Sequence, residues 1–440
     1  MLKCPTNCSA ADRSGAGKTA REFLARHGMY SAQTDLDLSL AEFLRQMRAG
    51  LAGAPSSLLM IPTYISGSVQ PKNRRVLALD AGGTNFRAAV VSFDGAGAPT
   101  IERMEKRPMP GTRGKLTRDE LFGAIADAIM PMADASDDVG FCFSFPAEIL
   151  PSREGRILCF NKEVKIDGAE GALIGAGINA ALSRRGKKPK RFTLLNDTVA
   201  TLLTGMSGDT SRFDGYIGYI LGTGTNTAYQ ERGGAIPKLP GANAPMIVNM
   251  ESGGYDGFRQ GTFDRELDGA SEVPGDHKME KMISGAYQGD LIYRTVRGAA
   301  KEGLFSDAFR RRLERFSTFS MLEISAYCAG ETDSELAALP GNDAEAGILW
   351  TIVEDSFDRA ARMTAVNFAA ILTQTDTGRT PERPACITAE GTTFFKSPLF
   401  RPKLDGYIAQ WLNQKQKRYC AILQGEGATI YGSAVAALQV

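Results

Sequence analysis

Histidine is scarce in this chain. Its 440 residues include only two histidines, His27 and His277, and they lie far apart in the sequence. A metal site built from several histidines is therefore excluded, and a histidine-based catalytic triad would depend on one of these two residues. We expect carboxylates to carry out any acid-base chemistry.

The chain also lacks an excess of charge of one sign and a long apolar run. Lys plus Arg total 51 and Asp plus Glu total 50, so the formal charge of +1 offers no field to attract nucleic acid or an anionic membrane. No segment approaches about 18 apolar residues, and residues 1–14 lack the apolar core of a signal peptide. The seven cysteines are an odd number in a long chain, which favours a reducing compartment. We expect a cytoplasmic protein with small-molecule partners.

Glycine, in contrast, is abundant. The chain has 48 glycines, more than the usual share of about 7%, which predicts tight turns or close approach of the backbone to a ligand. Residues 15–19, Gly-Ala-Gly-Lys-Thr, resemble the end of a P-loop, but Asp12 replaces the first glycine and no strand precedes the segment. We therefore interpret residues 15–19 as the start of a helix. The basic run at residues 184–191 is interpreted as a solvated loop.

The pattern of apolar residues predicts two halves built alike. Strands at 75–79 and 88–93 flank a glycine-rich bend, and strands at 216–221 and 225–231 repeat this plan around Gly222-Thr223-Gly224. The other predicted elements are helices at 37–47, 116–132, 168–183, 197–206, 348–372 and 432–438, and strands at 101–107, 139–145, 192–195 and before Glu390. No linker separates the halves, so we expect them to share a cleft.

The two glycine-rich bends are suited to binding phosphate. Backbone amides in such a bend form an anion nest, and glycine allows them to approach a phosphate closely. Asp80 ends the strand before the first bend, and a carboxylate beside a phosphate is unfavourable unless Mg²⁺ lies between them. The pair of bends indicates a nucleotide-phosphate site.

Several motifs resemble those of the hexokinase family, in the same order along the chain. Residues 80–87 and 221–226 are similar to its two phosphate motifs, and residues 141–146 and 195–201 to its sugar motifs. Further matches are residues 60–64, 249–251, 280–285 and 390–392. The resemblance implies an α/β protein with the two-domain actin-like ATPase (ribonuclease H-like) fold, a duplicated mixed β-sheet core and an interdomain cleft. It also implies transfer of the γ-phosphate of ATP to the 6-hydroxyl of a hexose, with glucose preferred and fructose or mannose as further candidates.

The resemblance assigns a role to each matching residue. Asp197 corresponds to the catalytic base, and Lys162 to a second catalytic group facing the transferred phosphate. Because Asp197 starts a helix, we expect its pKa to be lowered. The implied sugar-binding residues are Ser144, Asn161, Lys162, Asn196, Asp197, Asn226, Glu251 and Glu280. The implied ATP-binding residues are Asp80, Gly83, Thr84, Thr223, Gly224, Gly391, Thr392 and Gly432, with Arg87 either on phosphate or in an ion pair.

Magnesium is expected to be held by the ATP phosphates and water, with Asp80 and Asp197 near it and no cluster of protein ligands. The implied domains are 68–196 plus 428–440 (small) and 1–67 plus 197–427 (large), with hinges near residues 63–68 and 196–197. The small domain is expected to rotate onto the large one around a bound hexose.

The sequence departs from the family at some positions. Phe160-Asn161-Lys162 stands where the family usually has Trp-Thr-Lys, and Ser252-Gly253-Gly254-Tyr255 where it tends to have Trp-Gly-Ala-Phe. These changes leave sugar preference open. Two alternative interpretations remain: an actin-like ATPase, and a sugar sensor with little catalytic activity. The oligomeric state is not predicted.

Overall fold

The computed structural model describes residues 10–67, 71–160, 164–207, 210–331, 334–425 and 427–439. The strands are β1 (Ile61–Pro62), β2 (Arg74–Ala81), β3 (Asn85–Phe93), β4 (Pro99–Pro108), β5 (Leu116–Thr117), β6 (Asp138–Phe143), β7 (Ala147–Ile149), β8 (Gly155–Ile157), β9 (Ile166–Asp167), β10 (Arg191–Leu195), β11 (Gly215–Leu221), β12 (Thr225–Glu231), β13 (Met246–Asn249), β14 (Ala385–Glu390) and β15 (Cys420–Gln424). The α-helices are α1 (Ala10–Arg26), α2 (Leu36–Ala52), α3 (Arg118–Ile129), α4 (Ile174–Ser183), α5 (Asp197–Gly205), α6 (Thr262–Ala270), α7 (Lys278–Ile283), α8 (Gly285–Lys301), α9 (Asp307–Leu313), α10 (Met321–Ala329), α11 (Asp343–Thr375), α12 (Thr392–Lys396), α13 (Phe400–Tyr407) and α14 (Ala428–Ala437).

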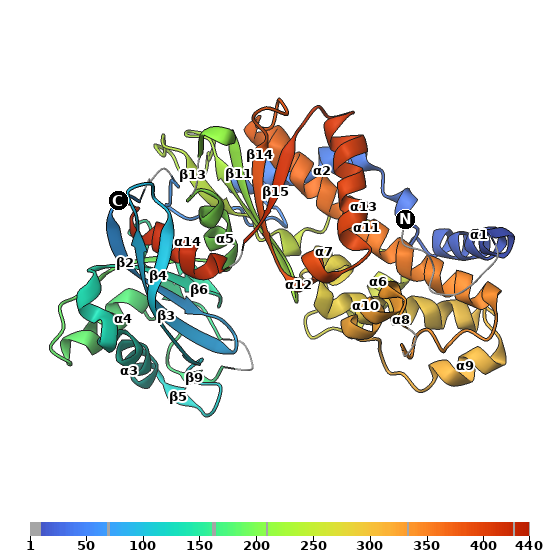
Figure 1. Cartoon of the computed structure of the whole chain (residues 1–440), viewed down its shortest axis with the longest axis horizontal. Coiled ribbons are helices and arrows are strands. Elements are labelled where there is room, and N and C mark those ends of the chain that lie inside the picture. The colour runs from blue at the N-terminus through green and yellow to red at the C-terminus, as the bar shows by residue number, and fades with distance from the viewer. Residues whose placement is uncertain are drawn as a thin grey trace.

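Two sheets with the same topology form the core (Figure 1). The first has the order β4-β3-β2-β6-β10, and the second has β13-β12-β11-β14-β15, extended at one edge by β1. In each, the first three strands in sequence pair antiparallel, the fourth pairs in parallel with the first, and the fifth pairs in parallel with the fourth. The predicted duplication of the α/β core is thus confirmed.

The helix that follows each sheet packs against the other sheet. Helix α5 follows β10 of the first sheet but contacts β11, β12 and β14 of the second, whereas α14 follows β15 and contacts β2, β6 and β10 of the first. The two helices also cross each other, with the backbone of Gly432 close to the carbonyl oxygen of Ala200. This exchange places both helices between the sheets (Figure 1).

The alternation of side chains along β11 explains how the second sheet is covered on both faces. Tyr216 packs with α5, whereas Ile217, Tyr219 and Leu221 face the opposite side and join the largest core cluster, which includes apolar residues of α11. Successive side chains in a strand point to opposite faces, so one buried strand supplies two cores. The same alternation in β2 separates Val76 from Leu77.

Most predicted elements are confirmed, and the differences have local causes. The strand predicted at 139–145 ends at Phe143; the amide of Ser144 still donates to the carbonyl of Ala81, and the chain then leaves the sheet before Pro146, which has no amide to donate. The helix predicted from residue 116 begins at Arg118, because Thr117 and Glu120 cap its start reciprocally. The P-loop-like segment at 15–19 lies inside α1.

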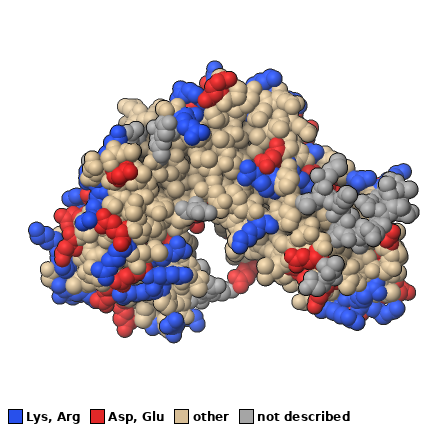
Figure 2. Space-filling view, viewed as in Figure 1, with Lys and Arg blue, Asp and Glu red and all other residues tan. Residues whose placement is uncertain are grey.

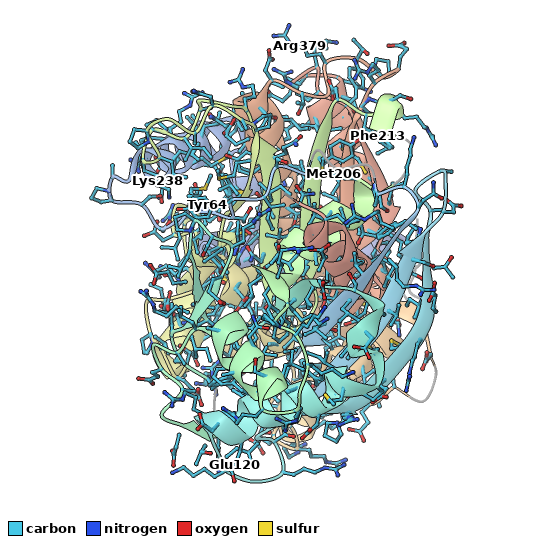
Figure 3. All side chains as sticks on the ribbon, turned by 90° about the vertical axis from the view of Figure 1, so that its left-hand side faces the viewer. Tyr64, Glu120, Met206, Phe213, Lys238 and Arg379 are labelled. Atoms are coloured by element: carbon cyan, nitrogen blue, oxygen red, sulfur yellow. The ribbon has the colours of Figure 1, made fainter. Side chains whose placement is uncertain are left out.

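Figure 3 shows the molecule from its side, with Arg379 at one end and Glu120 at the other. Among the described helices, none has the length and apolar character needed to cross a lipid bilayer.

Candidate active site

Asp197 lies at the junction between β10 and α5. Asn196 caps the helix: its side-chain Oδ1 accepts from the amide of Thr198 at 2.9 Å, and Asp197 Oδ1 accepts from the same amide at 2.8 Å. The end of the last strand of the first sheet therefore places Asn196 at a cavity that residues of the second half also line. Figure 2 shows the surface to be hollowed between the two halves.

The expectation that the pKa of Asp197 is lowered is wrong. Burial raises it to about 6, and the negative charges of Glu251 and Asp80 add to this effect. The hydrogen bonds from Thr198 act in the opposite direction but do not compensate. The cost of removing a carboxylate from water exceeds the benefit of its place at a helix start. At pH 7 the group remains mostly ionised, and it is a stronger base than an ordinary aspartate.

Three carboxylates influence one another across the two halves. Burial raises the pKa of Asp80. Burial also raises the pKa of Glu390 to about 7, and the negative charges of Asp197 and Asp80 contribute to that increase. Thr429 of α14 donates to Asp80 at 3.1 Å, and Thr201 of α5 donates to Glu390 at 3.3 Å. Within the described residues, no group of acidic, cysteine or histidine side chains meets the spacing of a metal site. The cluster thus brings three carboxyl groups from both halves together, and their burial disfavours the ionised forms.

Arg87 takes up part of this charge. Its Nε lies 3.5 Å from Asp80 Oδ2, and the two residues are direct partners in the β2–β3 pairing. Of the two interpretations left open for Arg87, the structure contains the ion pair.

Asn226 and Glu251 come together through an amide that the sequence assignment omitted. Asn226 Nδ2 donates to Asn249 Oδ1 at 2.9 Å and lies 3.4 Å from Glu251 Oε1, and Asn249 Nδ2 donates to the same Glu251 oxygen at 2.7 Å. Glu251 has a positive φ of 55°, an uncommon conformation that clusters at functional sites. Asn249 could have been found from the sequence, because it belongs to the same matched motif, residues 249–251, that supplies Glu251.

Glu280 lies against the second glycine-rich bend. Its Oε2 accepts from the amide of Thr225 at 2.9 Å, and burial raises its pKa. A Cβ added at Gly224 would lie 2.6 Å from this carboxylate, and one added at Gly253 would lie 3.3 Å from it. Glycine at these two positions thus leaves room for the carboxylate beside the bend, and at Gly253 a Cβ would also lie 2.8 Å from the backbone oxygen of Thr225.

A cavity of about 310 Å³ connects residues of the two predicted sugar motifs. Its polar lining includes Ser144, Asn196, Asn249 and Glu251, and its other walls are mostly apolar. Ser144, which follows β6 of the first sheet, and Glu251, which follows β13 of the second, therefore face one space. Asn161 and Lys162, the other predicted members, lie outside the described residues.

The second bend is held by the starts of two helices. The carbonyl oxygen of Gly222 accepts from Gly285 at 2.8 Å and from Thr393 Oγ1 at 3.0 Å, which attaches α8 and α12 to the bend. Gly391 has a φ of 115°, and a Cβ on it would lie 2.1 Å from the carbonyl oxygen of Leu221. Thr223 and Thr392, both exposed, are thereby brought to the same region.

The other predicted ATP-binding residues occupy two different environments. Gly83 and Thr84 form the bend between β2 and β3, with Thr84 exposed. Gly432 is instead buried, and an added Cβ would lie 2.0 Å from Ala200 O. The close packing of α14 on α5 explains why residue 432 is a glycine. A contact between Gly432 and adenosine stays a prediction.

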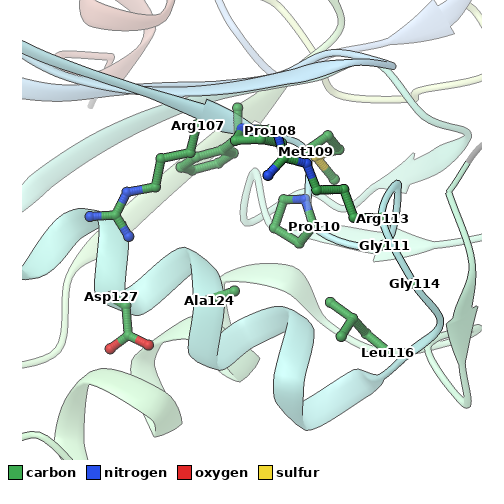
Figure 4. A pocket seen from close by; sticks show the side chains of 11 residues that line it. Arg107, Pro108, Met109, Pro110, Gly111, Arg113, Gly114, Leu116, Ala124 and Asp127 are labelled. Atoms are coloured by element: carbon green, nitrogen blue, oxygen red, sulfur yellow. The ribbon is translucent and has the colours of Figure 1, made fainter.

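A second cavity, of about 510 Å³, lies behind the first bend (Figure 4). It is enclosed by α3 and by the segment 107–116, and it contains none of the predicted site residues. Met109 in this segment donates its amide to Thr84 O, and Gly111 O accepts from Lys165 N. The segment therefore links the first bend to the chain just beyond Asn161 and Lys162.

Comparison with known proteins identifies the family to which the chain is related. Two hexokinase family models match the chain, one over residues 25–207 and the other over 216–439. Among relatives, hexokinase-1 of Oryza sativa subsp. japonica is 30% identical over 427 residues, covering 89% of this chain and 85% of that protein. The chloroplastic hexokinase-2 of Nicotiana tabacum is 35% identical, covering 73% of this chain and 66% of that protein, and hexokinase-3 of Homo sapiens is 28% identical. This chain spans about half the length of the human protein, with 47% covered.

A solved hexokinase of Schistosoma mansoni in complex with glucose has the same fold. Its TM-score is 0.75 at 23% identity, and the match covers 97% of this chain and 99% of that one. The chain belongs to the hexokinase family, and the predicted fold class and enzyme class are confirmed.

Proposed function

We propose that this chain transfers the γ-phosphate of ATP to the 6-hydroxyl of a hexose, with glucose as the preferred sugar. The observation that carries this proposal is the place of Asp197: it directly follows Asn196, which lines the cavity with Asn249 and Glu251, and the charges of Glu251 and Asp80 act on it. A hexose presents a ring of hydroxyls, each able to donate and accept, and short amides and carboxylates satisfy both roles.

Asp197 accepts the proton of the sugar hydroxyl as that oxygen attacks phosphorus. Its pKa of about 6 leaves it ionised at pH 7 and close to the pH at which it works, which favours a general base. Ser144, Asn196, Asn226, Glu251 and Glu280, together with the newly identified Asn249, orient the sugar. Asn161 and Lys162 remain assigned by resemblance, with Lys162 facing the transferred phosphate.

The two bends hold the triphosphate. The amides around Gly83 and Gly224 and the hydroxyls of Thr84 and Thr223 are the proposed donors, and Gly391, Thr392 and Gly432 form the adenosine side. The charge of Asp80, Asp197 and Glu390 fits a hydrated cation held mainly by the phosphates. When bound there, Mg²⁺ supplies neutralisation of the triphosphate charge.

The proposed small domain comprises residues 68–196 plus 428–440, and the large domain residues 1–67 plus 197–427. The packing of α14 on the first sheet and of α5 on the second supports these boundaries. Closure of the cleft around a hexose would exclude water, which would otherwise accept the phosphate. We also propose a cytoplasmic location.

A panel of hexoses in a coupled assay of ADP release tests the proposal. We expect ADP release only when hexose is added, and faster release with glucose than with fructose or mannose. ADP release that is independent of sugar would favour an ATPase. Sugar binding without ADP release would favour a sensor.

A further inference from the structure

A third cavity, of about 610 Å³, lies at the edge of the first sheet opposite the active site. Arg74, Asp138 and Arg191, which line it, are the first residues of the parallel strands β2, β6 and β10. Asp80 and Asn196 stand at the other ends of β2 and β10. At about 3.3 Å per residue, strands of this length place the cavity roughly 20 Å from the catalytic cleft.

Cationic side chains outnumber anionic ones in the lining. Arg74, Arg153, Lys190 and Arg191 contribute positive charge, and of the acidic side chains only Asp138 and Glu154 line the cavity. We propose that this cavity binds a small soluble molecule that carries a phosphate group.

The two carboxylates are already engaged. Asp138 is shared between two guanidinium groups, at 2.6 Å from Arg191 Nη2 and 3.3 Å from Arg74 Nη2. The carboxylate of Glu154 accepts from the amides of Gly175 and Ala176 at the start of α4. Neither carboxylate is therefore available to neutralise the remaining arginine.

Arg153 is the remaining arginine. Its backbone has a positive φ of 65°, and its Nη1 donates to the carbonyl oxygen of Gln439; within the described part of the chain, no carboxylate pairs with it. A guanidinium presents several N–H donors in a fork that matches phosphate oxygens. Arg153 and Arg191 are the proposed phosphate ligands. Arg74 adds charge, whereas Lys190 is already paired with Asp137, at 2.9 Å from its Oδ1.

The cavity is connected to the proposed hinge. Gln439 lines it, and the side-chain Oε1 of Gln439 accepts from Gly67 N at 3.1 Å and from Ser66 Oγ at 3.1 Å. Tyr64 of the same connector and Met206 at the end of α5 are marked in Figure 3, and Met206 lies beside Gly67. An anion that draws Arg153 away from Gln439 O acts on the residue that holds the connector. We therefore expect bound anion to change the hexose KM.

Calorimetric titration with inorganic phosphate tests the site directly. The cleft is first filled with glucose and a non-hydrolysable ATP analogue, and ionic strength is held constant with chloride. We expect one phosphate bound per chain, and a Kd at least about tenfold higher in Arg153→Gln and in Arg191→Gln, because each removes a charge-assisted contact. Lys188→Gln is the matched control, since Lys188 belongs to the same basic run but does not line the cavity; its Kd should change by less than about twofold.

Absence of phosphate binding in the filled enzyme would overturn the proposal, as would equal weakening by Lys188→Gln. The side chain of Arg191 is 74% exposed, so its substitution is expected to leave the fold intact, which thermal unfolding without phosphate checks. The expected shift of the hexose KM rests on the proposed kinase activity, whereas the binding of phosphate measured by calorimetry does not. Phosphate should shift the hexose KM in the unmodified protein and leave it unchanged in Arg191→Gln.

Discussion

Asp197 illustrates how two local effects compete at a single residue. Its helix-start position and the amide of Thr198 favour the ionised form, whereas burial and neighbouring carboxylates disfavour it. Burial prevails because the carboxylate loses its hydration, while one or two hydrogen bonds restore only part of that loss. The result is a base whose pKa of about 6 lies closer to neutral pH than that of an ordinary aspartate.

Replacement of Asp197 by alanine should abolish most turnover but not sugar binding. We expect kcat to fall by about 100-fold or more, the lower range of general-base effects, while hexose still binds through the remaining amides and carboxylates. A coupled ADP assay and a hexose titration by calorimetry measure the two quantities. Near-normal kcat in this variant would rule out Asp197 as the base.

The pH profile should reveal the raised pKa. The ionised form is the active base, so kcat/KM should rise with pH and level off above an apparent pKa of about 6. In Glu251→Gln the rise of kcat/KM should occur at lower pH, because the negative charge of Glu251 raises the pKa of Asp197. A rise of kcat/KM at the pH where an ordinary aspartate titrates would contradict the assignment of Asp197 as a base with a raised pKa.

The same pKa has a consequence for stability. A carboxylate whose pKa is raised on folding opposes folding once pH exceeds its unfolded value, and the cost grows until pH passes the folded pKa of about 6. Asp197→Asn should therefore raise Tm at pH 7, and by less at pH 4, which lies well below the folded pKa and close to the unfolded value of 3.8. Thermal unfolding at the two pH values checks the sign.

At the scale of elements, the junction of β14 and α12 positions the second glycine-rich bend, which is proposed to bind phosphate. Gly391 adopts a φ of 115°, which residues with a side chain rarely adopt, and a Cβ on it would lie 2.1 Å from the carbonyl oxygen of Leu221. Gly391→Ala should therefore destabilise the fold by about 1–3 kcal/mol and raise the KM for ATP. Gly406→Ala is the control: a Cβ there meets no atom within 4 Å, and alanine in a helix is favoured by about 0.5–1 kcal/mol. Denaturant unfolding measures the free energy of unfolding of both variants, and an ATP titration measures their KM for ATP. Equal changes in the two variants would contradict the role given to Gly391.

The elements were largely predictable, because their signals are local. The short apolar runs of β2, β3 and β11, and the glycine-rich bends that follow β2 and β11, appear directly in the sequence. The boundaries that differed depend on contacts the pattern does not contain, such as the reciprocal cap of Thr117 and Glu120 at the start of α3.

At the scale of the whole molecule, the exchange of α5 and α14 joins the two halves. Each helix is connected to one sheet and packs on the other, so a rotation of the proposed domains must be accommodated where these helices meet and in the connector after β1.

Hexose binding should make the molecule more compact. Small-angle X-ray scattering should show a smaller radius of gyration with glucose than without it, because closure buries the cleft. Glu251→Ala, which removes a proposed sugar ligand, should show no change at the same glucose concentration. An unchanged radius in the unmodified protein under saturating glucose would contradict closure.

The sequence by itself determined the family, the two glycine-rich bends and the duplicated plan, since these depend on residues close together in the chain. The tertiary structure decided the direction of the Asp197 pKa, the gathering of Asp80, Asp197 and Glu390, and the place of Asn249 beside Glu251 in the cavity. It also showed that Gly432 is required for packing against Ala200. Burial and the charges of distant residues control these properties, and both arise only when the two halves are brought together.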